Sequence, residues 1–301
     1  RVLYRFTPAT GDEVAPLTDH ALASRLSFMI WGTIPDQELL DLANKGQLKN
    51  PQVLQAQVER MLKDERSVAL ATEFTGLWLQ FADFRESVSP DPQRFKNFTP
   101  SLKDAMYREP VLFFQNLFQS NEPITDALFA DYTFLNEELA KHYGIEGVKG
   151  EQMRKVSIEN GQRGGILGMG ALLTKFSTPL RTSPVMRGHW LYEKVLGIHM
   201  PPPPPSVEPL SDDERNEEGL SVRQQLEQHR DNPACFSCHD KFDPLGIALE
   251  NFNPVGAWRN KDLAGEPIDN QGTFVSSGRT LDSIKGLREY LRENQDKFVE
   301  T

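Results

Sequence analysis

Two cysteines and a histidine stand close together in this chain, and no other cysteine occurs in its 301 residues. Cys235, Cys238 and His239 form the pattern C-x-x-C-H. In c-type haem attachment each thiol adds to one haem vinyl group, and the histidine that follows binds the iron from below the ring. The spacing therefore predicts one covalently bound haem c per chain, held by Cys235 and Cys238, with His239 as the proximal iron ligand.

Three other kinds of site use closely spaced cysteines. A thioredoxin-type redox pair opens a helix between two strands, and this region shows no such pattern. A zinc site needs four ligands, and only His229 is near enough in sequence to join the three residues. A disulfide between residues three apart closes a loop too small to add much stability. Haem attachment takes place outside the cytoplasm, so we expect a periplasmic or extracellular bacterial protein.

The sixth iron ligand decides what such a haem does. From Asp240 to the C-terminus there is no methionine and no histidine, so a strong ligand must come from upstream. Met200, beside a run of prolines, is the first candidate and Met186 the second, although methionines most often pack in cores. His189 and His199 are their neighbours. Lysine, water or no ligand at all stay open.

Three arginines are candidates for pairing with the haem propionates, because a guanidinium matches a carboxylate in geometry. They are Arg181, Arg187 and Arg259, and ordinary surface salt bridges are the alternative for each. The sequence contains no Ser-His-Asp set, phosphate-binding glycine loop or H-E-x-x-H motif. It therefore predicts no catalytic residue beyond the haem itself.

The composition restricts the partners. The net charge is −10 and the pI about 5.2, which disfavours nucleic acid and anionic lipid. Hydrophobic residues make up 38% of the chain, enough for a sizeable core, but no apolar run reaches the roughly 18 to 20 residues of a membrane span. The chain begins at Arg1 without a methionine, so we expect a processed product or a piece of a longer protein.

The elements that must position the motif are predicted to be mainly α-helices, with one helical body from about residue 18 to 197. Thr18, Asn50 and Thr182 or Ser183 are expected N-caps. Residues 67–81 are expected to form one apolar helix buried on most sides.

Other features break or follow the helical pattern. Pro110 should kink or divide a long helix near Glu109. Residues 201–219 combine five prolines, expected to form a stiff rod, with an exposed acidic stretch open to proteolysis. A helix at 220–230, a small hairpin within 265–278 and a last helix at 281–294 complete the expected elements.

Several motifs resemble those of large secreted bacterial proteins first noted in planctomycetes. The haem motif is followed by D-P-L-G (243–246), A-L-E-N-F (248–252) and G-x-W-R (256–259), and upstream segments such as "YTFLNEELAKHYGI" are similar to the same family. The resemblance implies domain of unknown function 1592, then the haem-bearing domain of unknown function 1588, then the start of domain of unknown function 1585. It implies no known reaction.

The expected architecture is a mainly α, bundle-like helical domain and a small cytochrome c-like haem module. The expected segments are a helical domain (1–200), a linker (201–219), the haem module (220–275) and the start of a C-terminal helical module (276–301).

The function expected from these features is that of a secreted monohaem cytochrome module that relays electrons. Its partners would be a protein electron donor or acceptor, or other domains of a longer parent chain. A haem peroxidase or oxygenase with an open or weakly held distal iron position is one alternative. A helical binding module with an auxiliary haem is another.

Overall fold

The protein is mainly α-helical, as the sequence predicts, in a computed structural model. Its described part contains fourteen α-helices and four short strands. In this part no helix is long and apolar enough to cross a membrane. The described residues are 16–158, 161–201, 213–214, 219–230, 233–262 and 265–301.

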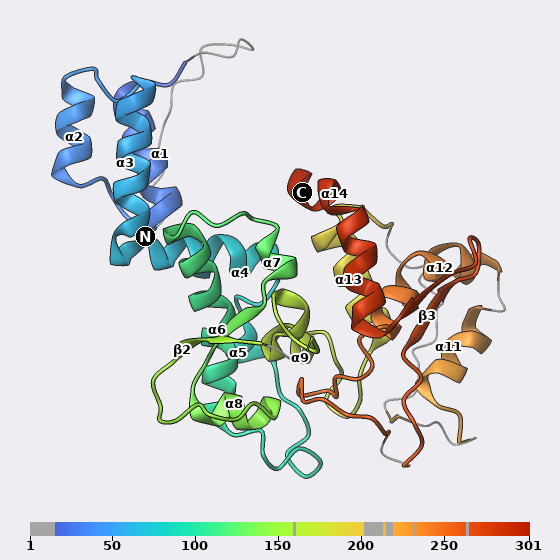
Figure 1. Cartoon of the computed structure of the whole chain (residues 1–301). Coiled ribbons are helices and arrows are strands. Elements are labelled where there is room, and N and C mark those ends of the chain that lie inside the picture. Colours follow the sequence, from blue (N-terminus) through green and yellow to red (C-terminus); the bar gives the residue numbers. More distant parts are fainter. Residues whose placement is uncertain (1–15, 159–160, 202–212, 215–218, 231–232, 263–264) are drawn as a thin grey trace.

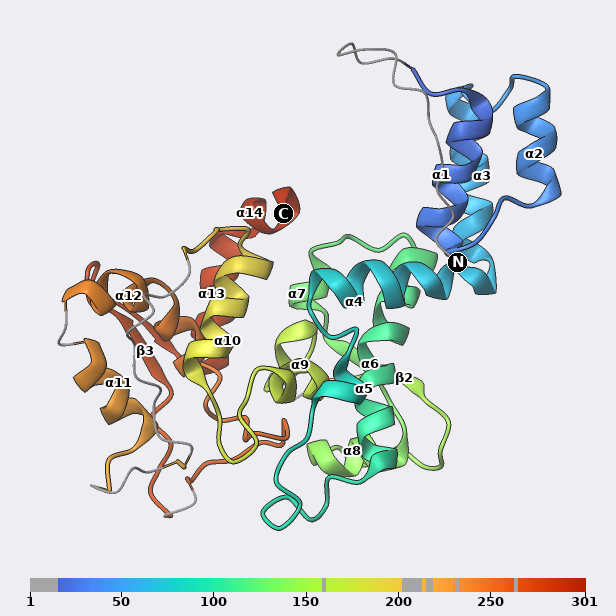
Figure 2. The ribbon, with the colours of Figure 1, turned by 180° about the vertical axis from the view of Figure 1, so that it is seen from behind.

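Three N-terminal helices form a small bundle that projects from the rest of the molecule (Figures 1 and 2). Their side chains have their own apolar core, which includes Ile30, Trp31 and Met61. The predicted cap Thr18 accepts a hydrogen bond from the N–H of Ala21, and Asn50 caps the third helix. The helices are α1 (Asp19–Trp31), α2 (Gln37–Asn44) and α3 (Pro51–Lys63).

The apolar segment that follows α3 differs from the prediction of one buried helix. It consists of a 3₁₀ turn (Glu65–Ser67), a π-helix (Leu70–Phe74) and the short α4 (Thr75–Trp78). Phe74 is 53% exposed and Leu77 is 69% exposed. The prediction of burial on most sides is therefore wrong, because the wider π turn breaks the 3.6-residue repeat that would keep all apolar side chains on buried faces.

The central part is built around the long helix α6 (Pro100–Gln119). A short antiparallel sheet packs beside it, in which Thr133 lies opposite Val156. The other elements are α5 (Phe84–Ser87), α7 (Asp126–Phe129), β1 (Tyr132–Leu135), α8 (Glu137–Tyr143), β2 (Arg154–Ser157), a 3₁₀ turn (Ile166–Gly168) and α9 (Gly170–Lys175).

Pro110 does not divide α6, which continues through it for nine more residues. The helix is held on both sides of the proline by buried side chains, among them Met106, Phe113 and Phe114. Tertiary burial of these aromatic groups outweighs the one main-chain hydrogen bond that a proline removes. The predicted division of the helix is therefore wrong.

Glu109, the neighbour of Pro110, is a buried carboxyl at the heart of the central part. It accepts hydrogen bonds from Thr133 Oγ1 at 2.7 Å and from the Tyr143 hydroxyl at 2.5 Å. Burial nevertheless raises its pKa to about 7, and the two hydrogen bonds only partly offset this effect. Tyr143 in turn accepts from the N–H of Gly170, and Arg163 lies over its ring. This network ties α6, β1 and α8 to the segment that leads into α9.

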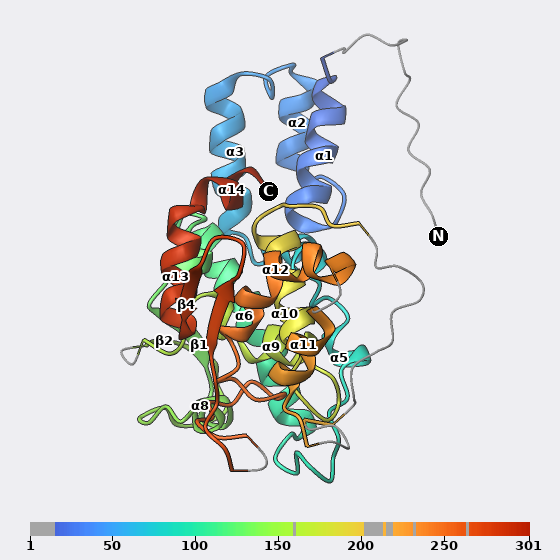
Figure 3. The same ribbon diagram turned by 90° about the vertical axis from the view of Figure 1, so that its right-hand side faces the viewer.

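The C-terminal part brings together α10, α12, α13 and a β-hairpin (Figure 3). The hairpin lies slightly later than predicted, and the last predicted helix is present as α13. The elements are α10 (Pro184–Trp190), a π-helix (Leu191–Val195), α11 (Val222–Arg230), α12 (Pro233–Ile247), β3 (Gln271–Phe274), β4 (Arg279–Asp282), α13 (Ser283–Glu293) and α14 (Gln295–Glu300).

One hydrophobic core extends across most of the chain, from Ala71 to Phe298. It contains Trp190 and Leu191, which precede the proline run, together with Leu245 and Leu249, which follow it. The helical body and the motif-bearing helix are thus packed into one body. The predicted polyproline rod and its exposed acidic stretch lie almost wholly outside the described residues.

Candidate haem site

Helix α12 places the three motif residues on one face. Cys235, Cys238 and His239 occupy positions i, i+3 and i+4, which are neighbours on a helix surface. All three side chains are partly exposed, and both cysteines are free thiols. The two thiols are therefore accessible for thioether formation, and the imidazole lies beside them as the haem motif requires.

A buried carboxylate orients the imidazole of His239. Nδ1 of His239 lies 3.0 and 3.1 Å from the two carboxylate oxygens of Asp243, one helical turn further on. The Asp243 side chain is fully buried, whereas that of His239 is 17% exposed. A carboxylate accepts hydrogen bonds, so it favours the tautomer with the proton on Nδ1 and leaves Nε2 free to bind a metal. This pairing is the arrangement that supports many metal-binding histidines.

Two further histidines lie around this face. The ring of His229, in the last turn of α11, is 4.9 Å from the ring of His239, between centroids. On the other side Phe242 lies 5.0 Å from His239, and His189 on α10 lies 5.8 Å from Phe242. Burial, followed by the charge of His239, lowers the pKa of His229 and so favours its neutral form.

Helix α10 crosses α12 with main chain against main chain. A β-carbon on Gly246 would lie 1.8 Å from the carbonyl oxygen of Pro184, and one on Gly188 would lie 2.1 Å from that of Phe242. Neither distance is possible between non-bonded atoms. The glycine of the D-P-L-G motif is therefore required for the close approach that fixes α12 and its histidine.

The β-hairpin holds α12 from another side. Asp240 accepts hydrogen bonds from the main-chain N–H groups of Val275 at 2.5 Å and Ser276 at 3.2 Å. Gly272 in β3 approaches the carbonyl of Pro244 so closely that a β-carbon would lie 2.0 Å from its oxygen. The D-P-L-G segment is thus fixed by α10 and β3 together, which makes the position of His239 rigid.

The predicted propionate partners lie away from this face. Arg259 pairs with Glu214 and, at 3.3 Å, with Glu250, which follows His239 by about three helical turns. Arg181 is buried and donates to the carbonyl of Thr182. Both arginines stay predicted propionate partners only, because their described contacts are to other parts of the chain.

Arg187 has no access to solvent and serves the scaffold. Its side chain is 1% exposed. It donates to the carbonyls of Leu249 and Phe252 at 3.0 and 2.8 Å, and also to those of Leu173 and Asn253. These bonds close the A-L-E-N-F segment onto α9 and α10.

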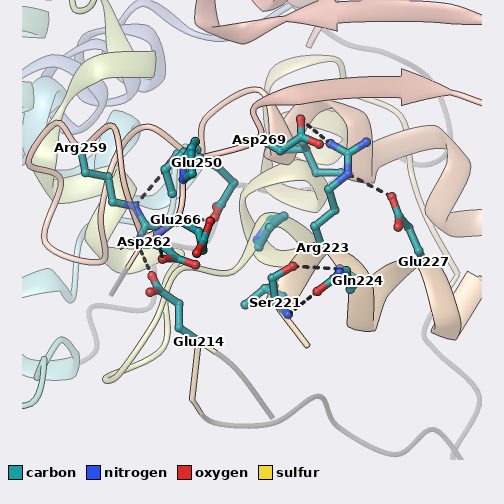
Figure 4. Close-up of a pocket in the computed structure, with 15 residues that line it drawn as sticks. Glu214, Ser221, Arg223, Gln224, Glu227, Glu250, Arg259, Asp262, Glu266 and Asp269 are labelled. Atoms are coloured by element: carbon teal, nitrogen blue, oxygen red, sulfur yellow. Dashed lines mark hydrogen bonds and ion pairs between the residues drawn. The ribbon is translucent and has the colours of Figure 1, made fainter. Parts of the chain in front are cut away.

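A pocket of about 530 Å³ lies at the far end of α12, where Ile247 and Glu250 contribute to its wall (Figure 4). Six carboxylates and two arginines line it. Arg223 already pairs with Glu227 and Asp269, each at 3.0 Å. The surplus of carboxylates disfavours anionic groups such as propionates, so this pocket is distinct from the candidate haem site.

The candidate axial methionines differ in exposure. Met200 is 7% exposed, as expected of a packing residue, and Met186 on α10 is 41% exposed. The imidazole found in ring contact with His239 belongs to His229 instead. Within the described residues, no group of three or more His, Cys, Asp or Glu side chains is placed to hold a metal ion by itself.

Two residues of the site were not identified by sequence reasoning. Asp243 follows His239 by four residues, a spacing that predicts a contact on a helix, but it was interpreted only as part of the D-P-L-G motif. His229 was considered only as a zinc ligand. Its proximity to His239 depends on how α11 folds back along α12, which no local pattern in the sequence reveals.

Two family models match the chain. The first, PSD4, protein of unknown function (DUF1592), matches residues 17–145, and the second, PSCyt3, protein of unknown function (DUF1588), matches residues 163–262. Comparison with curated proteins and with solved structures gave no match. The cysteine motif and the proline run both fall in the second region, and the expected start of a DUF1585 region stays a prediction. The chain therefore belongs to the proteins that carry a DUF1592 region followed by a DUF1588 region, in the order that its motifs predict.

Proposed function

We propose that this chain is a secreted monohaem c-type cytochrome module that relays electrons within or to a larger redox protein. The observation that supports this most is the arrangement on α12. Cys235, Cys238 and His239 share one partly exposed face, and buried Asp243 fixes the imidazole through Nδ1. The name PSCyt3 of the second family model agrees with a cytochrome.

The residues of the chain divide the work of holding the cofactor. The two thiols would tether a haem, and Nε2 of His239 would bind its iron. Bound there, a haem c supplies a one-electron redox centre. The rigid support of α12 by Gly246 and Asp240 keeps the ligand in place without help from the cofactor. Because the face is partly exposed, a protein donor or acceptor could approach it directly.

One observation favours the second candidate, a haem peroxidase or oxygenase. The contact with Asp243 makes the His239 imidazole a stronger electron donor than an imidazole hydrogen-bonded to a neutral group. Electron donation by the proximal ligand favours cleavage of an O–O bond. The carboxylate alone therefore does not separate the two functions, and the sixth ligand does.

The experiment compares the oxidised and reduced absorption spectra of the haem-loaded protein and its reaction with hydrogen peroxide. The relay function predicts low-spin iron in both oxidation states, reversible reduction by a soluble electron donor and slow reaction with peroxide. High-spin oxidised iron together with rapid consumption of peroxide would instead support the peroxidase. Iron that cannot be cycled between its two oxidation states would exclude the relay.

A further inference from the structure

The sixth iron ligand can be sought among the side chains that surround His239. Five other histidines occur in the chain. Three are engaged elsewhere: His20 bonds to Asn44, His142 bonds to the carbonyl of Val255, and His199 is 86% exposed beside Glu193. His189 packs against Phe242 and not against His239 itself. His229 is the one whose ring is in contact with the ring of His239.

The position of His229 follows from how α11 packs. Val222 and Leu226 are buried against the body of the protein, and His229 follows Leu226 by three residues, so it lies on the same side of the helix. The ring planes of His229 and His239 are inclined by 72°, with centroids 4.9 Å apart. Two imidazoles from separate helices thus converge on one point.

The imidazole of His229 is available as a ligand. In the described part of the chain neither of its nitrogens forms a hydrogen bond, and its described contact is the ring of His239. By contrast, Nδ1 of His239 is committed to Asp243, which defines the outward nitrogen as Nε2. One side chain is therefore held in place and the other is free to turn.

We propose that His229 is the sixth ligand of the iron that His239 binds, which gives a bis-histidine haem. This assignment rests on the proposed haem c function and replaces Met200 and Met186 as the expected ligand. A haem between the two rings would end their direct contact, so α11 must move outward on binding. The helix has nine residues, of which only Val222, Gln225 and Leu226 are buried, so few contacts resist such a shift.

A bis-histidine iron has consequences that a methionine ligand does not share. Both axial positions are occupied by strong ligands, so peroxide has no open coordination site. A thioether ligand raises the reduction potential of a haem relative to a second imidazole. The assignment thus favours electron relay over peroxide chemistry, at a lower potential than a histidine–methionine haem would have.

The test uses the haem-loaded chain and four single variants. Near-infrared magnetic circular dichroism and electron paramagnetic resonance of the oxidised wild type should show bis-histidine ligation, without the sulfur-to-iron band of a methionine ligand. His229→Ala should become high-spin and bind cyanide at least tenfold faster, and added imidazole should restore the low-spin spectrum. His189→Ala, Met186→Ala and Met200→Ala are matched controls that should keep the wild-type spectrum.

The outcomes separate this inference from the function on which it rests. Wild-type protein with covalent haem but with a methionine or water signature would overturn the assignment of His229 alone. The same holds if His229→Ala stays low-spin. If no covalent haem is present at all, both the proposed function and the assignment fail. The wild-type spectrum decides the question even if His229→Ala is produced in poor yield.

Discussion

Nδ1 of His239 lies 3.0 Å from a carboxylate oxygen of Asp243, whose side chain is fully buried. The two residues are one helical turn apart on α12, and the helix is clamped between α10 and the β-hairpin. This pair turns a sequence motif into a preformed ligand. The imidazole is oriented before any cofactor arrives, so little side-chain freedom is lost on binding.

Replacement of Asp243 by asparagine should raise the reduction potential of the haem-loaded protein. An amide in place of the carboxylate makes the imidazole a weaker electron donor, which disfavours oxidised iron. Redox titration followed by visible absorption measures the change. Asp240→Asn is the matched control, because Asp240 is also buried on α12 but bonds to the hairpin. An equal shift in both variants would show that the effect does not pass through His239.

Removal of either cysteine should lower the haem that stays on the chain, and removal of both should abolish it. Each thiol makes one thioether, so Cys235→Ala and Cys238→Ala keep at most one covalent bond. The haem content of each purified variant after denaturation gives the result. Ser237→Ala changes an exposed residue between the two cysteines and should leave haem content unchanged. Full retention in the double variant would contradict thioether attachment.

The local part of this fold could be predicted from the sequence. Thr18, Asn50 and Ser183 are helix caps as expected, because a cap depends on residues within one turn of it. The mainly α class and the last helix follow from patterns of the same short range. The course of α6 through Pro110 could not be predicted, because it depends on Phe113 and Phe114 packing against residues distant in sequence.

The site divides in the same way. Cys235, Cys238 and His239 could be identified because their chemistry is set by spacing alone. The surroundings of the motif depend on contacts between elements far apart in the sequence. The approach of α10 to Gly246 and the ion pair between Arg259 and Glu250 are examples. Pairing rules for single residues predict what an arginine prefers to bind, but not which carboxylate the fold brings to it.

Gly246→Ala should destabilise the protein by about 1–3 kcal/mol or more, because the added methyl group cannot fit against Pro184. Chemical denaturation of the variant measures the loss. Gly286→Ala in α13 is the matched control, since its added carbon would meet its nearest atom at 3.1 Å rather than 1.8 Å. A smaller loss at Gly286 than at Gly246 is expected. Equal losses would contradict the tight crossing of α10 and α12.

Glu109 should make the protein less stable as the pH rises from about 4.5 to about 7. The pKa of Glu109 is raised from 4.5 in the unfolded chain to about 7 in the fold, so the folded state holds its proton more tightly. The stability linked to this proton is fully present below the unfolded pKa. It is lost as the pH rises through the folded pKa, and the difference is on the order of 3 kcal/mol.

Glu109→Gln tests this directly, because an amide cannot ionise. The free energy of unfolding in urea, measured from pH 4.5 to 8, should fall less for the variant than for the wild type. Glu59→Gln on exposed α3 is the control and should keep the wild-type profile. A wild-type curve and a Glu109→Gln curve that run parallel would show that Glu109 does not titrate in this range.

The central claim is covalent attachment of one haem, and the mass of the denatured chain tests it most directly. The chain should be produced in a bacterial host that exports it and attaches haem c, then unfolded in acidified organic solvent and weighed by mass spectrometry. The account predicts a mass greater than that of the polypeptide by one haem, with the added mass on the peptide that contains Cys235 and Cys238. A chain with the bare polypeptide mass, whose haem extracts freely or whose metal proves to be zinc, would contradict it.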